Sequence, residues 1–335
     1  MMEPAEGRSL LVCPRCLGSL ADLRCVQCGA QYESPGGIPQ LLLPLDSKTE
    51  QVRRFYEAAP FPGYSPREDF AGLRARGQRS DFARQLDAAI PARATVLELG
   101  CGTGQMSLFL ANGERRIVAA DLARASLELA AAAAQKMGVR GVLFVETDLR
   151  RPGLQAEVFD VVCSLGVLHH TPDPAASFAC LSRLVKPGGF VVVGLYNAFA
   201  RLPHRLRRGL SRASGFRWFP LDPVLTERGM DPARRDAWIR DQYRHPEEHR
   251  HTVREVRRWF ARNGIQFLRT FPSSVLDGSA EQSLFSAAED SWTFEEWLVQ
   301  LSWMVTLWRE GGLFIAIGQA PPAANSSPGP RSGTP

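Results

Sequence analysis

The sequence predicts an α/β protein with a seven-stranded, mostly parallel sheet, helices on both faces and a small cysteine-rich module at the N-terminus. Three observations lead to this expectation. Between residues 95 and 197, short apolar runs alternate with stretches of helical periodicity, which is typical of β-α-β units. A glycine-rich turn joins the first of these runs to a helix. Four of the seven cysteines lie close together near the start of the chain.

Composition excludes several classes of protein. The chain has 335 residues, of which 44% are hydrophobic, so it can bury a large core and is not a wholly disordered chain. No apolar run approaches the roughly 20 residues of a membrane span, and the first ten residues lack the profile of a secretory signal. We therefore expect a cytoplasmic protein without a membrane span. The net charge of +5 rests on arginine, since only Lys48, Lys136 and Lys186 are lysines.

Residues 1–45 are expected to form a zinc ribbon. The cysteines form two C-x-x-C pairs, and two intervening residues allow both sulfurs of a pair to reach one ion. In a chain without an export signal this spacing favours a metal over disulfides, and four thiolates around Zn²⁺ form a closed, structural site. The alternative is a redox dithiol or two unrelated pairs. The predicted zinc ligands are Cys13, Cys16, Cys25 and Cys28.

Residues 46–80 are expected to be a linker that packs on the following domain. Prolines and glycines interrupt any long periodicity here, but the aromatic cluster between Phe55 and Tyr64 is too apolar for a linker exposed to solvent. Helical spacing begins at Phe82 and stops at Pro91. The main domain is therefore expected to occupy residues 81–320.

A strand, a glycine turn and a helix follow one another after residue 95. Gly100, Gly102 and Gly104 let the backbone approach a ligand closely, and Glu98 precedes them. The third glycine comes one residue too early for the nicotinamide-cofactor fingerprint, which makes a dehydrogenase a remote alternative. A carboxylate at this place would repel a pyrophosphate, whereas it can hold the ammonium group of a cofactor that contains an amino acid.

Polar side chains end the next three predicted strands. The second strand ends in Asp121. Its separation in sequence from the glycine turn is that of an acid that binds the hydroxyls of a ribose. The third leads to Asp148, which can accept a hydrogen bond from an adenine amino group or instead cap a helix. The fourth leads to His169 and His170, which face an active site or simply begin a helix.

The remaining elements complete the sheet and leave two insertions. A fifth strand is expected at 190–196, a sixth at 265–271 and an antiparallel seventh at 312–318. The insertions, 198–251 and 272–311, leave the sheet at the edge where ligands bind in open α/β folds, so we expect helical substrate lids. Apolar residues at helical spacing in the second lid favour core packing over an aromatic substrate pocket; they are Trp297, Leu298, Leu301, Met304, Val305 and Trp308, preceded by Trp292.

The first insertion is strongly basic. Its arginines can bind phosphates of RNA or an anionic substrate, although a solvated helical face is the favoured interpretation; they are Arg205, Arg207, Arg208, Arg212 and Arg217. A second metal site is a weaker possibility, because Pro246 favours a helix start; its ligands would be His245, Glu247, Glu248, His249 and His251. The tail 321–335 is rich in proline, serine and glycine and is expected to be disordered.

Several motifs in the same order resemble those of one enzyme family. V-L-E-L-G-C-G-T-G, the acid-ended strand, T-D-L, F-D-V-V, L-H-H-T-P-D-P and K-P-G-G, over about residues 80–197, are similar to class I S-adenosylmethionine-dependent methyltransferases. The nearest type is that of ubiquinone and menaquinone biosynthesis. The resemblance implies a Rossmann-like sheet and S-adenosyl-L-methionine as cofactor. The implied cofactor-binding residues are Glu98, Gly100, Gly102, Gly104, Asp121, Leu122, Asp148, Leu149 and Leu165.

The resemblance also implies methyl transfer, with the acceptor left open. The N-terminal module resembles zinc ribbons that are fused to, or partner, some methyltransferases. We expect a small-molecule acceptor, with an RNA methyltransferase and a non-catalytic cofactor-binding subunit as alternatives. His169 or His170 would be the base, with His169 preferred and His170 pointing elsewhere, and Tyr196 would position the acceptor. The oligomeric state cannot be predicted.

Overall fold

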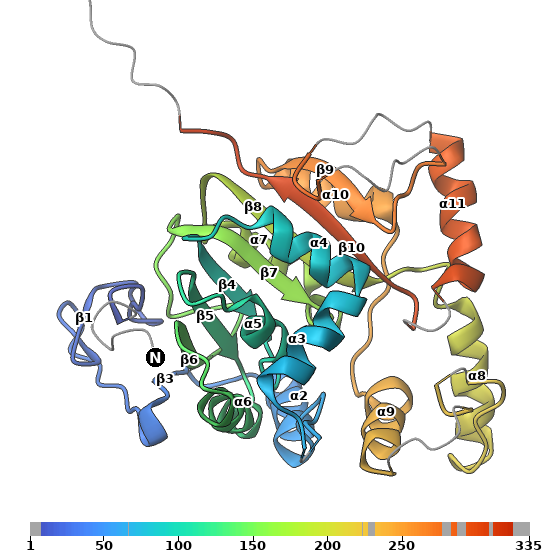
Figure 1. The fold of residues 1–335 in the computed structure, drawn as a ribbon, viewed down its shortest axis with the longest axis horizontal. Coiled ribbons are helices and arrows are strands. Elements are labelled where there is room, and N and C mark those ends of the chain that lie inside the picture. Colours follow the sequence, from blue (N-terminus) through green and yellow to red (C-terminus); the bar gives the residue numbers. More distant parts are fainter. Residues whose placement is uncertain are drawn as a thin grey trace, which may run out of the picture.

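The structure, a computed structural model, describes residues 8–65, 67–222, 224–226, 232–276, 283–286, 293–307 and 311–323. An eight-stranded sheet forms its centre (Figure 1). The strands are β3 (Gln40–Leu41), β4 (Thr95–Leu99), β5 (Arg116–Asp121), β6 (Val142–Thr147), β7 (Phe159–Leu165), β8 (Val185–Tyr196), β9 (Gln266–Phe271) and β10 (Leu313–Gln319). Their order in the sheet is β3-β6-β5-β4-β7-β8-β10-β9.

The strand directions confirm the predicted fold class. Strands β3 to β8 pair in parallel, whereas β10 runs antiparallel to both β8 and β9. The seven expected strands are all present, and β3 is an addition. It comes from the N-terminal module and joins the free edge of β6, where Gln40 pairs with Glu146.

Both faces of the sheet are buried, which explains the continuous apolar runs in the central strands. Alternate residues belong to two different cores, Val96 and Ile117 to one and Leu97 and Val118 to the other. The first core is covered by α3 (Phe70–Arg79), α4 (Asp81–Ala89), α5 (Gln105–Leu110) and α6 (Arg124–Met137). The second is covered by α7 (Pro174–Ser182), α10 (Val253–Arg262), α11 (Thr293–Thr306) and the N-terminal module.

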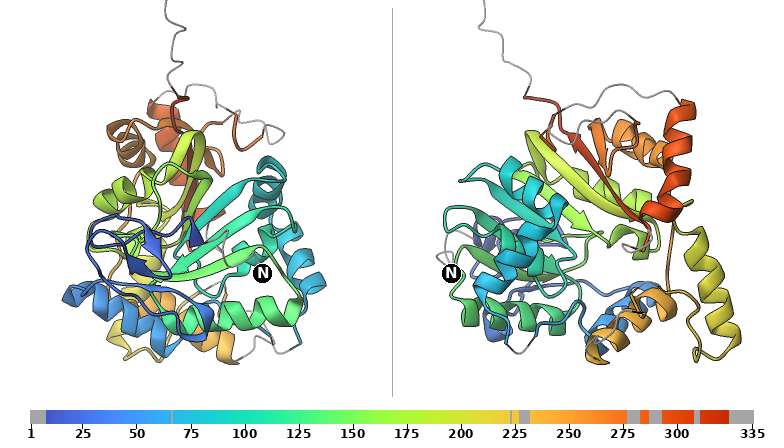
Figure 2. Two further views of the ribbon diagram at one scale, coloured as in Figure 1. Left: turned by 90° about the vertical axis from the view of Figure 1, so that its left-hand side faces the viewer. Right: turned by 45° about the vertical axis from the view of Figure 1, so that its right-hand side comes forward.

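The N-terminal module is attached to the sheet at one edge (Figures 1 and 2). It contains a short hairpin of β1 (Leu20–Ala21) and β2 (Arg24–Cys25). Besides the pairing of β3, the Val12 amide donates to the Gly153 carbonyl over 3.0 Å. A side chain at Gly153 would lie 2.7 Å from Leu41, so the module and the loop after β6 are in close contact.

The segment between the module and the main domain is partly helical, although its prolines and glycines interrupt any long periodicity. Helix α2 (Ser47–Ala58) begins at Asp46, whose carboxylate accepts from the amides of Lys48 and Thr49 at 3.0 Å each. This N-cap is a local signal that outweighs the prolines farther along. At its other end, Glu57 accepts the Arg124 amide at 2.7 Å and thereby caps α6.

The two insertions contain helices that lie beside the carboxyl edge of the sheet (Figure 2). The first holds α8 (Leu202–Ala213) and α9 (Pro232–Arg244), and the second holds α11. Core packing of the apolar positions of α11 was a wrong prediction for most of them, because Trp297, Leu298, Leu301 and Val305 are exposed. Trp292, Trp308 and residues 324–335 of the tail lie outside the described residues. Within the described part of the chain, no helix has the length and apolarity to cross a bilayer.

Candidate functional site

A cavity of about 470 Å³ lies at the carboxyl ends of β4 to β8. This is the edge where ligands bind in open parallel sheets. Helices α2 and α9 cover it, and the Tyr56 hydroxyl donates to Asp241 over 3.1 Å, which links the two helices across the cavity. Its lining includes Tyr56, Phe61, Glu98, Gly100, Gly102, Asp121, Leu122, Asp148, Leu149, Leu165, Val167, His170, Tyr196, Trp238, Asp241 and Gln242.

The glycine turn leaves no room for side chains. Gly100 and Gly102 have φ values of 77° and 53°, which L residues rarely adopt. A Cβ at Gly102 would lie 2.6 Å from the Phe61 carbonyl oxygen. Gly104 lies outside the cavity lining and instead contacts α6, where its Cβ would meet that of Ala130 at 2.9 Å. The prediction that Gly104 lies beside a cofactor is therefore corrected: Gly104 allows close packing against α6.

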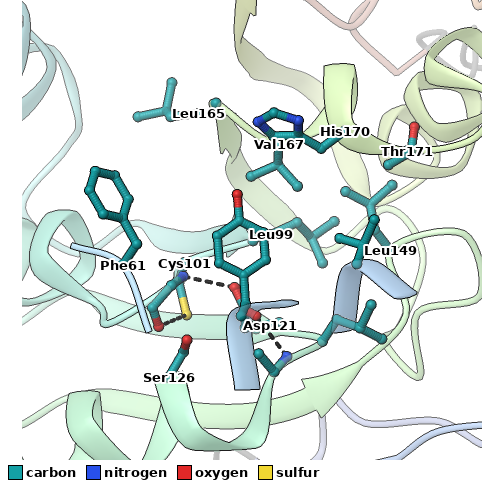
Figure 3. Close-up of a pocket in the computed structure, with 18 of the residues that line it drawn as sticks. Phe61, Leu99, Cys101, Asp121, Ser126, Leu149, Leu165, Val167, His170 and Thr171 are labelled. Carbon is teal, nitrogen blue, oxygen red and sulfur yellow. Dashed lines mark hydrogen bonds between the residues drawn. The ribbon is translucent and has the colours of Figure 1, made fainter. Parts of the chain in front are cut away.

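Asp121 ends β5 beside this turn (Figure 3). Its carboxylate accepts the amides of Gly102 and Ala123, each at 2.8 Å, so it fixes the turn from the neighbouring strand. Burial raises the pKa of Asp121, and the amide hydrogen bonds oppose that rise. A carboxylate held in this way presents its remaining lone pairs to the cavity, where paired hydroxyl groups would be suitable donors.

Glu98 lies one residue before the end of β4 and is almost fully buried. The Ser107 hydroxyl donates to its carboxyl group. Burial raises the pKa of Glu98 to about 7, although the hydrogen bonds from Ser107 oppose this change. Since Glu98 also lines the cavity, a cationic group placed there would stabilise its ionised form.

The raised pKa of Glu98 predicts how the stability of the cofactor-free protein depends on pH. The folded-state pKa of about 7 exceeds the reference value of 4.5, so the folded state binds more protons between these values. Stability should therefore fall as pH rises through this window, by roughly 3 kcal/mol in total. We expect Glu98→Gln to remove most of this dependence in urea unfolding between pH 4.5 and 8. Glu114→Gln, at an exposed position, is the control, and equal pH dependence in both variants would contradict the assignment.

Asp148 lines the cavity but is already partnered. Its carboxylate lies 3.0 Å from the Arg150 guanidinium and also accepts the Arg150 amide. Arg150 in turn forms an ion pair with Asp46 at 2.6 Å, before α2. Asp148 therefore stabilises the loop after β6. Its Oδ1 faces both the backbone amide and the Nε of Arg150. The three predicted apolar residues, Leu122, Leu149 and Leu165, also line the cavity.

The positions of the two adjacent histidines are the reverse of the expectation. A 3₁₀ turn at Leu168–His170 sends consecutive side chains in directions about 120° apart, and His170 faces the cavity whereas His169 does not. His169 is fully buried, its ring stacks on Tyr196 at a centroid distance of 3.9 Å, and burial lowers its pKa well below the usual value.

The hydrogen bond of His170 determines its tautomer. Its Nδ1 lies 2.7 Å from the Glu247 carbonyl oxygen, which can only accept, so the proton is on Nδ1 and Nε2 carries a lone pair. Burial lowers the pKa of His170 to about 4, so the ring is neutral near pH 7. The His245 ring packs against it at 3.6 Å between centroids.

A polar network from α9 forms the part of the cavity that sequence reasoning missed. Gln242 donates to the Tyr196 hydroxyl at 2.9 Å and to Asp241 at 2.8 Å. Arg201 donates to Gln242 at 2.7 Å and lies over the Tyr196 ring at 3.8 Å from its centroid. Burial raises the pKa of Asp241. Tyr196 is thus held in place on both faces and at its hydroxyl.

The four N-terminal cysteines have the arrangement of a metal site. Their sulfur atoms all lie within 4.8 Å of one another, with 3.6 Å between Cys13 and Cys28 and 3.4 Å between Cys16 and Cys25. A tetrahedral zinc site with bonds of about 2.3 Å has sulfur-sulfur edges of about 3.8 Å, so the cluster fits Zn²⁺. Among the described residues, no other group of three or more possible ligands gathers in this way, including the histidines after α9.

Comparison with known proteins identifies the central domain. Residues 97–193 match the family model described as a methyltransferase domain. Residues 97–193 form a methyltransferase domain. The match covers the glycine turn, Asp121, the histidine pair and most of β8.

Two relatives and one solved structure show how far the similarity of this methyltransferase domain extends. An uncharacterized protein of Synechococcus sp. is 30% identical over 257 residues, which are 67% of this chain and 60% of that protein. Ubiquinone biosynthesis O-methyltransferase of Cereibacter sphaeroides is 26% identical over 176 residues, 48% of this chain and 70% of that enzyme. Magnesium protoporphyrin IX methyltransferase of Synechocystis with bound SAH is 15% identical, covers 82% of this chain and all of that chain, and has a TM-score of 0.48.

Proposed function

We propose that the chain transfers a methyl group from S-adenosylmethionine to a small-molecule acceptor. One observation carries the proposal: a single cavity contains the carboxylates of Glu98 and Asp121 beside the glycine turn, and also His170 and Tyr196. The carboxylates suit the amino-acid and ribose parts of the cofactor, and the imidazole and phenol suit an acceptor that carries a proton.

The donors and acceptors in the cavity fit the cofactor. Asp121 would accept from the ribose hydroxyls, Glu98 would balance the ammonium group, and the apolar Leu122, Leu149 and Leu165 would surround the adenine ring and its neighbours. When bound, S-adenosylmethionine supplies an electrophilic methyl group. The protein would hold the acceptor in line and exclude water, for which the cover formed by α2 and α9 is suited.

His170 is our candidate for the base, in place of His169. Its Nε2 lone pair can accept the acceptor's proton at neutral pH, because the ring is neutral and oriented by the Glu247 carbonyl. Tyr196 would position the acceptor, since its ring and hydroxyl are both fixed by neighbours. A hydroxyl or protonated nitrogen acceptor requires such a base, whereas a carbon or an ionised thiol does not.

The cover of the cavity favours a small acceptor over RNA. Tyr56 and Asp241 join α2 to α9, and aromatic residues such as Phe61 and Trp238 line the space below. Two arginines of the basic insertion are engaged within the fold, Arg207 beside Asp222 at 3.6 Å and Arg208 with Glu248 at 3.0 Å.

An assay with methyl-labelled S-adenosylmethionine and cell extract, fractionated into RNA and metabolites, distinguishes the possibilities. We expect label in the metabolite fraction. Label confined to RNA would support an RNA methyltransferase instead. Intact cofactor binding with no labelled product would support a non-catalytic subunit.

We further propose that the cysteine cluster holds one structural zinc ion, and Cys13→Ser tests this. Because the module is too small to bury a core of its own, loss of a ligand should release the metal and unfold residues 8–41 while β4 to β8 stay folded. Elemental analysis and amide hydrogen exchange measure the two effects. Cys180→Ser, a cysteine outside the cluster, is the control. Protein prepared without chelator that contains no zinc would contradict the proposal.

A further inference from the structure

Helix α8 presents leucines to solvent and polar residues to the protein. Leu202, Leu206 and Leu210 have exposed fractions of 39%, 69% and 41%. They recur every four residues and so lie along one side of the helix. The residues on its buried side include His204 and Arg207. This is the reverse of the usual orientation of an amphipathic helix on a globular protein.

Helix α11 has apolar residues on two sides. Val299 and Trp303 are buried in the second core, together with the polar Glu296 and Gln300 at 8% and 1% exposure. Its exposed apolar residues are Phe294 at 74%, Trp297 at 51%, Leu298 at 45%, Leu301 at 37% and Val305 at 77%. Single exposed apolar residues are ordinary, but a row of five on one helix marks an interaction surface.

The two helices are neighbours in the fold. Trp297 of α11 packs against Phe199, just before α8, at 4.7 Å between ring centroids. Both helices lie on the same side of the molecule in Figure 1 and in the right-hand view of Figure 2. We name this surface the lid face; it consists of Leu202, Leu206, Leu210, Phe294, Trp297, Leu298, Leu301 and Val305.

The exposed charged residues of α8 and of the described segment just after it are basic. Arg205 and Arg212 of α8 are exposed between and beside its leucines, and Arg217 follows the helix. The acidic residues described in α11 are Glu295, which is half-buried and accepts the Leu276 amide at 2.6 Å, and Glu296, which is buried. Apolar and cationic residues together are the composition of helices that lie in the interface of an anionic bilayer.

We propose that the lid face binds the surface of an anionic lipid membrane, with its leucines and aromatic side chains among the acyl chains and its arginines at the lipid phosphates. A second copy of this chain fits less well, since a shared two-fold contact would bring the same arginines together. RNA fits less well because its recognition does not use rows of exposed leucines. The proposal does not depend on the methyl acceptor.

Vesicle flotation with the full-length, zinc-containing protein tests the proposal. We expect binding to vesicles with phosphatidylglycerol, much weaker binding to pure phosphatidylcholine, and a decrease with added salt. The double variant Leu206→Gln with Leu298→Gln should bind at least tenfold more weakly, because both side chains lose apolar contact with lipid. Arg205→Gln with Arg212→Gln should lose about fivefold for each charge.

The matched control is Leu129→Gln, at a leucine of α6 with 43% exposure that lies outside the lid face. It should bind vesicles like the unaltered protein. Failure of the unaltered protein to bind anionic vesicles would overturn the proposal, and so would equal loss in the control. A lid-face variant that changes sedimentation from dimer to monomer without changing vesicle binding would also overturn it, in favour of self-association. S-adenosylmethionine binding is measured in parallel. A protein that binds the cofactor but not the vesicles contradicts the membrane proposal alone, and one that binds the vesicles but not the cofactor contradicts the proposed methyl transfer alone.

Discussion

Replacement of His170 by alanine is expected to lower turnover about 10²-fold or more, the usual scale for a lost general base, while S-adenosylmethionine affinity changes less than about threefold. His170 lines the cavity with Nε2 unprotonated, whereas no other imidazole lies in that lining among the described residues. Single-turnover assays and calorimetry measure the two quantities.

Two histidine variants serve as comparisons. His249→Ala removes a half-buried imidazole outside the cavity and should leave turnover unchanged. His169→Ala removes a ring that packs on Tyr196 and should act mainly on stability, with a smaller effect on turnover through Tyr196. Full turnover in His170→Ala would refute a histidine base at this site. A large loss confined to His169→Ala would restore the original preference for His169.

Replacement of Asp121 by alanine is expected to weaken S-adenosylmethionine binding by about 1.5 to 3 kcal/mol for each charged hydrogen bond lost, which is at least tenfold. The substitution removes the proposed ribose acceptor and also frees the Gly102 and Ala123 amides that hold the glycine turn. Asp81→Ala, at an exposed aspartate of α4, is the control for calorimetry. Unchanged affinity in Asp121→Ala would refute the assignment of Asp121, at the end of β5, as the residue that binds the ribose.

The parallel strands and the glycine turn could be predicted because each depends on nearby residues. The run Val96–Leu99 is apolar apart from Glu98, which is characteristic of a strand buried on both faces, and the turn follows at once. The two C-x-x-C pairs are equally local, and their sulfurs come together as the spacing predicted.

The cover of the cavity could not be predicted, because it joins segments far apart in the sequence. Tyr56 and Asp241 are separated by 185 positions, and nothing near either residue indicates the other. The cap at Asp46 is a local signal for the start of α2. The pairing of β3 with β6 likewise depends on a distant edge.

Periodicity indicates that a helix has an apolar side and does not indicate where that side points. The spacing of Trp297, Leu298 and Val305 suggested core packing, yet these residues face solvent. The apolar residues of α11 that do pack in the core include Val299 and Trp303. The same limit applies to His169 and His170. They are adjacent in a tight turn, yet His170 lines the cavity and His169 is buried away from it.

Calorimetric titration of the unaltered protein, purified without chelator, with S-adenosylmethionine and, separately, with NAD tests the central claim most directly. The geometry of Glu98, Asp121 and the glycine turn predicts one S-adenosylmethionine bound per chain and no saturable binding of NAD. Saturable binding of NAD without binding of S-adenosylmethionine would contradict it.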